Sequence, residues 1–156
     1  MTTTFWDARK SATLSIVVAW TALATGVAVG VLLVPLLGSM TGLSPVFSGL
    51  WLARTATCLY VCLAFGILAD IVLLFLLRDI RRGEVFTAPN VRRLRLISYC
   101  GFAITLASVI GAIITPPRLI FVGLAGVAAF LGLLMRVIKN IIDTARQLKE
   151  DADYTI

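Results

Sequence analysis

Four long apolar segments, each bounded by polar or turn-forming residues, dominate the hydrophobic pattern of the chain. They run from about residue 12 to 37, 55 to 77, 96 to 114 and 119 to 138. A helix needs roughly 20 apolar residues to cross the hydrocarbon core of a bilayer. The pattern therefore predicts an all-α membrane protein with four antiparallel transmembrane helices in two hairpins, packed as a compact bundle.

Turn-forming residues occupy the connections between the segments. Gly42, Ser44 and Pro45 lie in the first connection, and Pro116 and Pro117 lie in the short gap before the fourth segment. Proline is tolerated in the first turn of a helix but disrupts a helix interior. We therefore expect one helix to end and the next to begin at Pro116 and Pro117.

The composition excludes an ordinary soluble domain. Hydrophobic residues make up 60% of the chain and charged residues only 14%, against about 45–50% and about 25% in soluble domains. At 156 residues, the chain has room for four spans with short connections and for no second domain. Residues 1–156 are thus expected to form a single integral membrane domain.

The basic residues are distributed unevenly and predict the orientation. Of the 14 lysines and arginines, only Arg54 and Arg118 lie beside the first and third connections. The other 12 flank the opposite ends of the spans, where cytoplasmic loops collect positive charge. This predicts cytoplasmic termini, a cytoplasmic loop at 78–95 and a cytoplasmic tail at 139–156. The loop arginines are expected to contact anionic lipid headgroups, with no direct contact to nucleic acid; they are Arg78, Arg81, Arg82, Arg92, Arg93 and Arg95.

The third helix is expected to begin before the membrane, within this loop. Thr87 can cap it, Pro89 suits its first turn, and Phe86 and Val91 occupy the positions of a hydrophobic staple. Helical spacing then places one face toward the protein, formed by Val91, Leu94 and Ile97 or Ser98. The same spacing turns three arginines toward water or headgroups, namely Arg92, Arg93 and Arg95.

Two sequence motifs indicate a family. They are Gly83-Glu84-Val85-Phe86-Thr87 followed by Asn90, Arg93, Leu94 and Ile97, and the ending Glu150-Asp151-Ala152-Asp153-Tyr154-Thr155-Ile156. With its four spans, the chain resembles the bacterial membrane proteins grouped as domain of unknown function 2975. The resemblance implies a four-helix protein of the bacterial cytoplasmic membrane, of unknown activity, often encoded beside a helix-turn-helix regulator. It supplies no catalytic residues. The acidic part of the ending differs from the Glu-Asn-Asp-Leu type of run expected in the family.

Asp70 is the only carboxylate inside a span, eight residues before Arg78, or about 12 Å along a helix. A charge at such a position costs about 2.5–3.5 kcal/mol on insertion scales, so an intramembrane carboxylate is by default a functional candidate. Asp70 is either a proton or cation site, or a hydrogen-bond partner of Ser15, Tyr99 or Arg136.

Small residues recur four apart in the first span, at Ala22, Gly26 and Gly30, and in the fourth, at Ala125 and Ala129 and at Ala128 and Gly132. Such faces allow close helix packing, either within the chain or between copies in a homo-oligomer.

The cysteines, Cys58, Cys62 and Cys100, lie inside spans, and the chain has no histidine. We therefore expect packing roles for these thiols and no bound metal.

The fourth helix is expected to continue past the membrane as an amphipathic cytoplasmic extension. Its apolar stripe consists of Ile138, Ile141, Ile142, Ala145 and Leu148. The apolar side chains of such a stripe need other apolar groups to shield them from water. Either the cytoplasmic end of the second helix or a protein partner provides these groups, and the acidic tail could then fold back on the arginine loop.

The sequence contains no arrangement of side chains that matches a known catalytic chemistry. Without histidine, a nucleophile–base pair or a cofactor motif, we expect neither an enzyme nor a cofactor. The first hypothesis is a regulatory or scaffolding membrane protein that binds a cytosolic helix-turn-helix regulator. The second is a small oligomeric transporter or ion-conducting protein that uses Asp70.

Overall fold

A computed structural model describes residues 8–41, 49–82 and 87–153, and side chains within 13–39, 49–82 and 87–148. The described residues form four helices: α1 (Ala8–Thr41), α2 (Leu50–Arg81), α3 (Ala88–Ile114) and α4 (Arg118–Asp153). Each is long and apolar enough to cross a membrane. The four predicted spans are confirmed as helices, and they indicate a multi-pass membrane protein.

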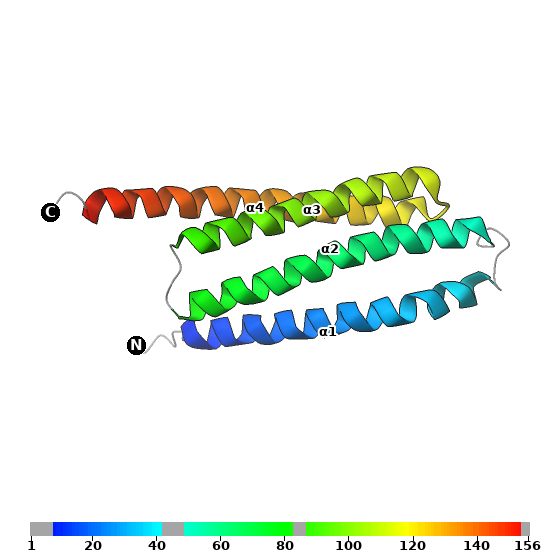
Figure 1. Ribbon diagram of the computed structural model, residues 1–156, viewed down its shortest axis with the longest axis horizontal. Coiled ribbons are helices and arrows are strands. Elements are labelled where there is room, and N and C mark those ends of the chain that lie inside the picture. Colours follow the sequence, from blue (N-terminus) through cyan, green and yellow to red (C-terminus); the bar gives the residue numbers. More distant parts are fainter. Residues whose placement is uncertain (1–7, 42–48, 83–86, 154–156) are drawn as a thin grey trace, which may run out of the picture.

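The helices form an open row (Figure 1). Consecutive helices run antiparallel and pack in sequence order, α1 on α2, α2 on α3 and α3 on α4. Within the described residues, no other pair of helix backbones comes close. The prediction of a compact bundle is therefore wrong, since α1 packs on α2 alone. Lipid tails are as apolar as leucine, so the hydrophobic effect does not force α1 and α4 together.

The start of α1, the end of α2, the start of α3 and the end of α4 lie at one end of this row (Figure 1). We call it the basic end, because 12 of the 14 lysines and arginines of the sequence flank the helix ends that meet there. The end of α1, the start of α2 and the turn between α3 and α4 lie at the opposite end. The uneven charge distribution along the sequence thus becomes a charge difference between the two ends of the molecule.

Glycines bring α3 and α4 into close contact. A methyl group on Gly101 would lie 3.0 Å from Cα of Gly132, and the Ser98 hydroxyl donates to the Gly132 carbonyl at 2.8 Å. Nearer the opposite end, a methyl group on Gly111 would lie 2.7 Å from the ring of Phe121, which is fully buried. Small residues therefore set the separation of this helix pair.

Glycines also shape the contact between α1 and α2. The Tyr60 hydroxyl donates to the Gly30 carbonyl at 2.9 Å, and a methyl group on Gly30 would lie 2.9 Å from Leu63. Gly26 faces Ile67, whereas Ala22 is exposed. Gly26 and Gly30 thus serve packing within the chain, the first of the two predicted alternatives.

The core at the basic end lies between α2 and α3. Its buried members are Val72, Leu76, Leu94 and Ile97.

Nearer the middle of the helices, the Cys62 sulfur lies 3.5 Å from the Ser108 hydroxyl. Cys62 and Cys100 are buried and Cys58 is half-buried, which agrees with packing roles for all three.

Both predicted helix boundaries in the second half of the chain are confirmed. Thr87 is the N-cap residue of α3 in extended conformation, with Pro89 in the first turn, although the Thr87 side chain makes no capping hydrogen bond. At the other boundary, the Thr115 amide and hydroxyl both donate to the Gly111 carbonyl, and α4 begins just after the two prolines. Phe86, the predicted staple residue, lies outside the described residues.

Candidate functional site

The contact between α2 and α3 at the basic end is held by a charged network. The guanidinium of Arg93 pairs with the Asp79 carboxylate and donates to the Asn90 side-chain oxygen at 3.0 Å. Asn90 is completely buried, and the Arg93 guanidinium also lies 5.9 Å from the centre of the Phe75 ring. This network, Asp79–Arg93–Asn90, joins the last turns of α2 to the first turns of α3.

The expectation that Arg93 faces water or headgroups is wrong. Its side chain is only partly exposed because it turns toward Asp79, an acidic residue that sequence reasoning missed. Asp79 could have been found as the only carboxylate among Arg78, Arg81 and Arg82. Asn90, one of the loop-motif residues, has its physical role in this network.

The remaining loop residues behave as expected where they are described. The predicted inner face of α3 is buried, and the remaining loop arginines are exposed: Arg78, Arg81, Arg82, Arg92 and Arg95. Gly83 and Glu84 lie outside the described residues, so their predicted part in the loop motif stays a prediction.

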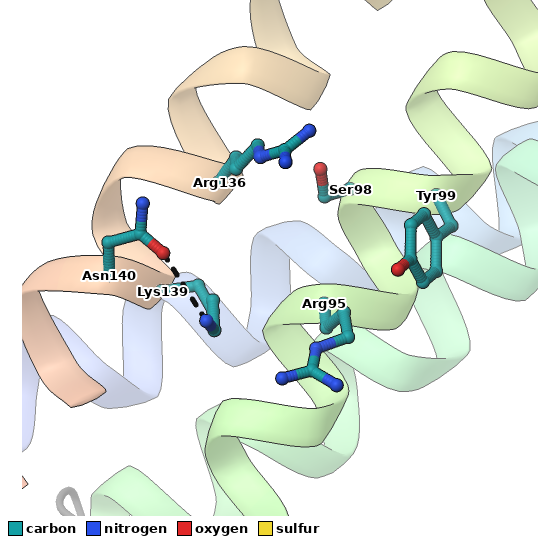
Figure 2. Close-up of a pocket in the computed structure, with 6 residues that line it drawn as sticks. All are labelled: Arg95, Ser98, Tyr99, Arg136, Lys139 and Asn140. Atoms are coloured by element: carbon teal, nitrogen blue, oxygen red, sulfur yellow. Dashed lines mark hydrogen bonds between the residues drawn. The ribbon is translucent and has the colours of Figure 1, made fainter.

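A second feature of the basic end is a pocket of about 270 Å³ between α3 and α4. We call it the basic pocket. Figure 2 shows Arg136 pointing from α4 toward α3, with Lys139 and Asn140 joined by a hydrogen bond on α4. Its described lining residues are Arg95, Ser98, Tyr99, Arg136, Lys139 and Asn140.

The polar side chains of the basic pocket differ in whether they form ion pairs or hydrogen bonds with other described residues. Lys139 lies 3.4 Å from the Asp143 carboxylate and donates to the Asn140 side chain at 3.3 Å. Among the described residues, no ion pair or hydrogen bond involves the side chain of Arg95 or of Arg136. Two guanidinium groups therefore stand at the pocket with their donors unused by the described part of the chain.

Asp70 lies apart from the basic pocket. It lines a groove of about 400 Å³ between α2, α3 and α4, whose other described lining residues are all apolar or glycine. No hydrogen bond or ion pair joins Asp70 to Ser15, Tyr99 or Arg136, so none of the three predicted pairings is formed. Tyr99 and Arg136 instead line the basic pocket.

The apolar stripe of α4 is divided between two environments. Ile138 and Ile142 pack against the core between α2 and α3, and Ala145 is half-buried. Ile141 and Leu148 are 63% and 66% exposed. Packing within the chain therefore covers about half of the stripe, at Ile138 and Ile142, and leaves Ile141 and Leu148 exposed.

The family model described as protein of unknown function (DUF2975) matches residues 4–156. The chain belongs to this family. The DUF2975 match includes all four helices, the Asp79–Arg93–Asn90 network and the basic pocket. No curated protein and no solved structure matches the chain significantly. Within the described residues of this DUF2975 protein, no group of three metal-ligating side chains occurs.

Proposed function

We propose that this DUF2975 protein is a non-enzymatic regulatory or scaffolding protein of the bacterial cytoplasmic membrane, acting through its basic end. The basic end faces the cytoplasm under the positive-inside rule. Its partner is a cytosolic helix-turn-helix regulator, which follows from the gene neighbourhood that the family resemblance implies.

The uncovered half of the α4 stripe is the observation that carries this proposal. α4 has 36 residues and α3 has 27, so α4 projects about 13 Å past the start of α3 at 1.5 Å per residue. Figure 1 shows this projection, which leads to the C-terminus. Leu148 lies on it and Ile141 lies close to its base, both with apolar side chains exposed. A partner that covers them would remove this apolar area from water at about 25 cal/mol per Å².

The Asp79–Arg93–Asn90 network supports the same proposal. It fixes the ends of α2 and α3 relative to each other, and Ile138 and Ile142 fix α4 on the same core. The surface around the projection is therefore preorganised, which lowers the entropic cost of binding.

Copurification with a helix-turn-helix protein encoded beside this gene, which the family resemblance implies, tests the proposal. In the full-length protein, the double variant Ile141→Asp, Leu148→Asp should lose the partner, because two charges would enter the apolar contact. Gln147→Asp is the control for added charge, since it places one negative charge on the same projection at an exposed position outside the stripe, and it should retain the partner. Retention by both variants would reject the stripe as the binding surface.

The transport hypothesis has less support. An ion pathway through Asp70 needs polar groups on both sides of the carboxylate. The described lining of the Asp70 groove has no other polar side chain, so it offers an ion no further ligand. Proton-coupled uptake by the purified protein in liposomes, abolished by Asp70→Asn, would reverse this preference.

A further inference from the structure

We propose that the basic pocket between α3 and α4 binds the phosphate group of an anionic phospholipid. This site is separate from the proposed partner surface, because neither Ile141 nor Leu148 lines it. The inference therefore stands or falls independently of the helix-turn-helix partner.

The charge of the basic pocket favours an anion. Arg95, Arg136 and Lys139 contribute three positive charges, and Asp143, which pairs with Lys139, contributes one negative charge. The net charge is about +2, with neither arginine neutralised by a described carboxylate. Guanidinium groups bind phosphate through paired, charge-assisted hydrogen bonds.

The donors come from both helices. Arg136, Lys139 and Asn140 belong to α4, and Arg95 and Tyr99 belong to α3 (Figure 2). The Ser98 hydroxyl already donates its hydrogen to Gly132, so it is not available as a donor. A phosphate in the pocket would accept hydrogen bonds from the two helices at once and link them.

The location of the pocket favours a lipid as the source of this phosphate. Arg95 lies seven residues inside α3, about 10 Å from the helix start, at the basic end of a candidate membrane span. Basic pockets between transmembrane helices on the cytoplasmic side are known sites for acidic headgroups. Deeper in the span, Leu106 continues the face of Tyr99 and Leu133 continues the face of Arg136. Both leucines are more than half exposed, so they provide an apolar surface for acyl chains.

Lipid titration of the purified full-length protein in detergent, followed by native mass spectrometry, tests the inference. The probes are phosphatidylglycerol, zwitterionic phosphatidylcholine and inorganic phosphate. The double variant Arg95→Gln, Arg136→Gln should bind phosphatidylglycerol at least about tenfold more weakly, because it loses charge-assisted hydrogen bonds. Neither arginine has a described internal partner, so the variant should fold.

The matched control is Arg82→Gln, Arg92→Gln, which removes the same charge from exposed positions at the same end. It should change the affinity less than about twofold. Equal weakening in both double variants, or no weakening in either, would overturn the inference. Competition by millimolar inorganic phosphate, with no preference for phosphatidylglycerol, would support the phosphate site but overturn the lipid as its source.

Discussion

At the scale of single residues, burial and pairing separate side chains that have the same charge. Arg92 and Arg93 are adjacent in sequence, yet Arg92 is exposed and Arg93 pairs with Asp79 beside the buried Asn90. The two acidic residues of α2 differ in the same way, since Asp79 is paired and Asp70 lies in an apolar groove without a described partner.

Breaking the Asp79–Arg93 pair should destabilise the protein. We expect Arg93→Gln and Asp79→Asn each to lower the free energy of unfolding by about 1–3 kcal/mol, because each leaves a partly buried polar group without its charged partner. Arg92→Gln should change it by less than about 0.5 kcal/mol. Unfolding in detergent measures these values. In the double variant, a total loss equal to the sum of the two single losses would contradict a direct pair.

Asp70→Asn should leave the stability of the protein nearly unchanged. The amide keeps the shape of the carboxyl group, and no described ion pair is lost. Asp70→Leu should be neutral or stabilising, because it removes a polar group from an apolar groove. Thermal unfolding in detergent compares the three proteins. A marked loss of stability in Asp70→Asn would reveal a partner that needs the carboxylate.

At the scale of elements, α4 combines a candidate membrane span and an amphipathic extension in one continuous helix. Gly132 brings it close to α3, and Ile138 and Ile142 hold its later turns on the α2–α3 core. Ile141 is a neighbour of Ile142 in sequence but is mostly exposed. Because a helix turns by about 100° per residue, adjacent isoleucines can have different roles.

Substitutions at Ile141 and Ile142 should differ in their effect on stability. Ile142→Asp should lower the free energy of unfolding by about 1–3 kcal/mol, because it places a charge against the apolar core. Ile141→Asp should have little effect on stability, since its side chain is exposed. Hydrogen exchange of residues 141–148 should be slow in the wild type and faster in Ile142→Asp. Fast exchange in the wild type would show that the extension is not held on the α2–α3 core.

At the scale of the whole molecule, the open row has two chemically different ends. The basic end carries 12 of the 14 lysines and arginines, the network and the basic pocket, whereas Arg54 lies over Trp51 at the opposite end. Tryptophan and a long basic side chain are typical of a membrane–water interface. The two ends of the molecule thus differ in charge and in side-chain type, and the topology prediction depends on this difference.

This orientation can be tested with single cysteines in a cysteine-free background. An impermeant thiol reagent applied to intact cells should label Gly42→Cys and should not label Gly83→Cys, because the basic end is expected in the cytoplasm. Labelling after permeabilisation controls for accessibility of both sites. The reverse pattern would invert the proposed topology and move the partner surface outside the cell.

The sequence by itself determined the four helices, their order and their boundaries near the loop motif and the two prolines. These depend on local properties, namely apolar segment length, turn residues and charge near span ends. The inner face of α3, with Val91, Leu94 and Ile97, was also readable, because helical periodicity places such residues on one side.

Only the tertiary structure decided which helices meet and which charges pair. Periodicity indicates that a helix face is apolar, but it does not show whether lipid or protein covers that face. The sequences of α1 and α4 therefore could not predict the open row. Three features depend on how two helices are rotated and shifted against each other. They are the Asp79–Arg93 pair, the division of the α4 stripe into covered and exposed residues, and the placement of Arg95 and Arg136 in one pocket. Close contacts at residues such as Gly101 and Gly132 set that rotation and shift, and those contacts exist only once the helices have packed.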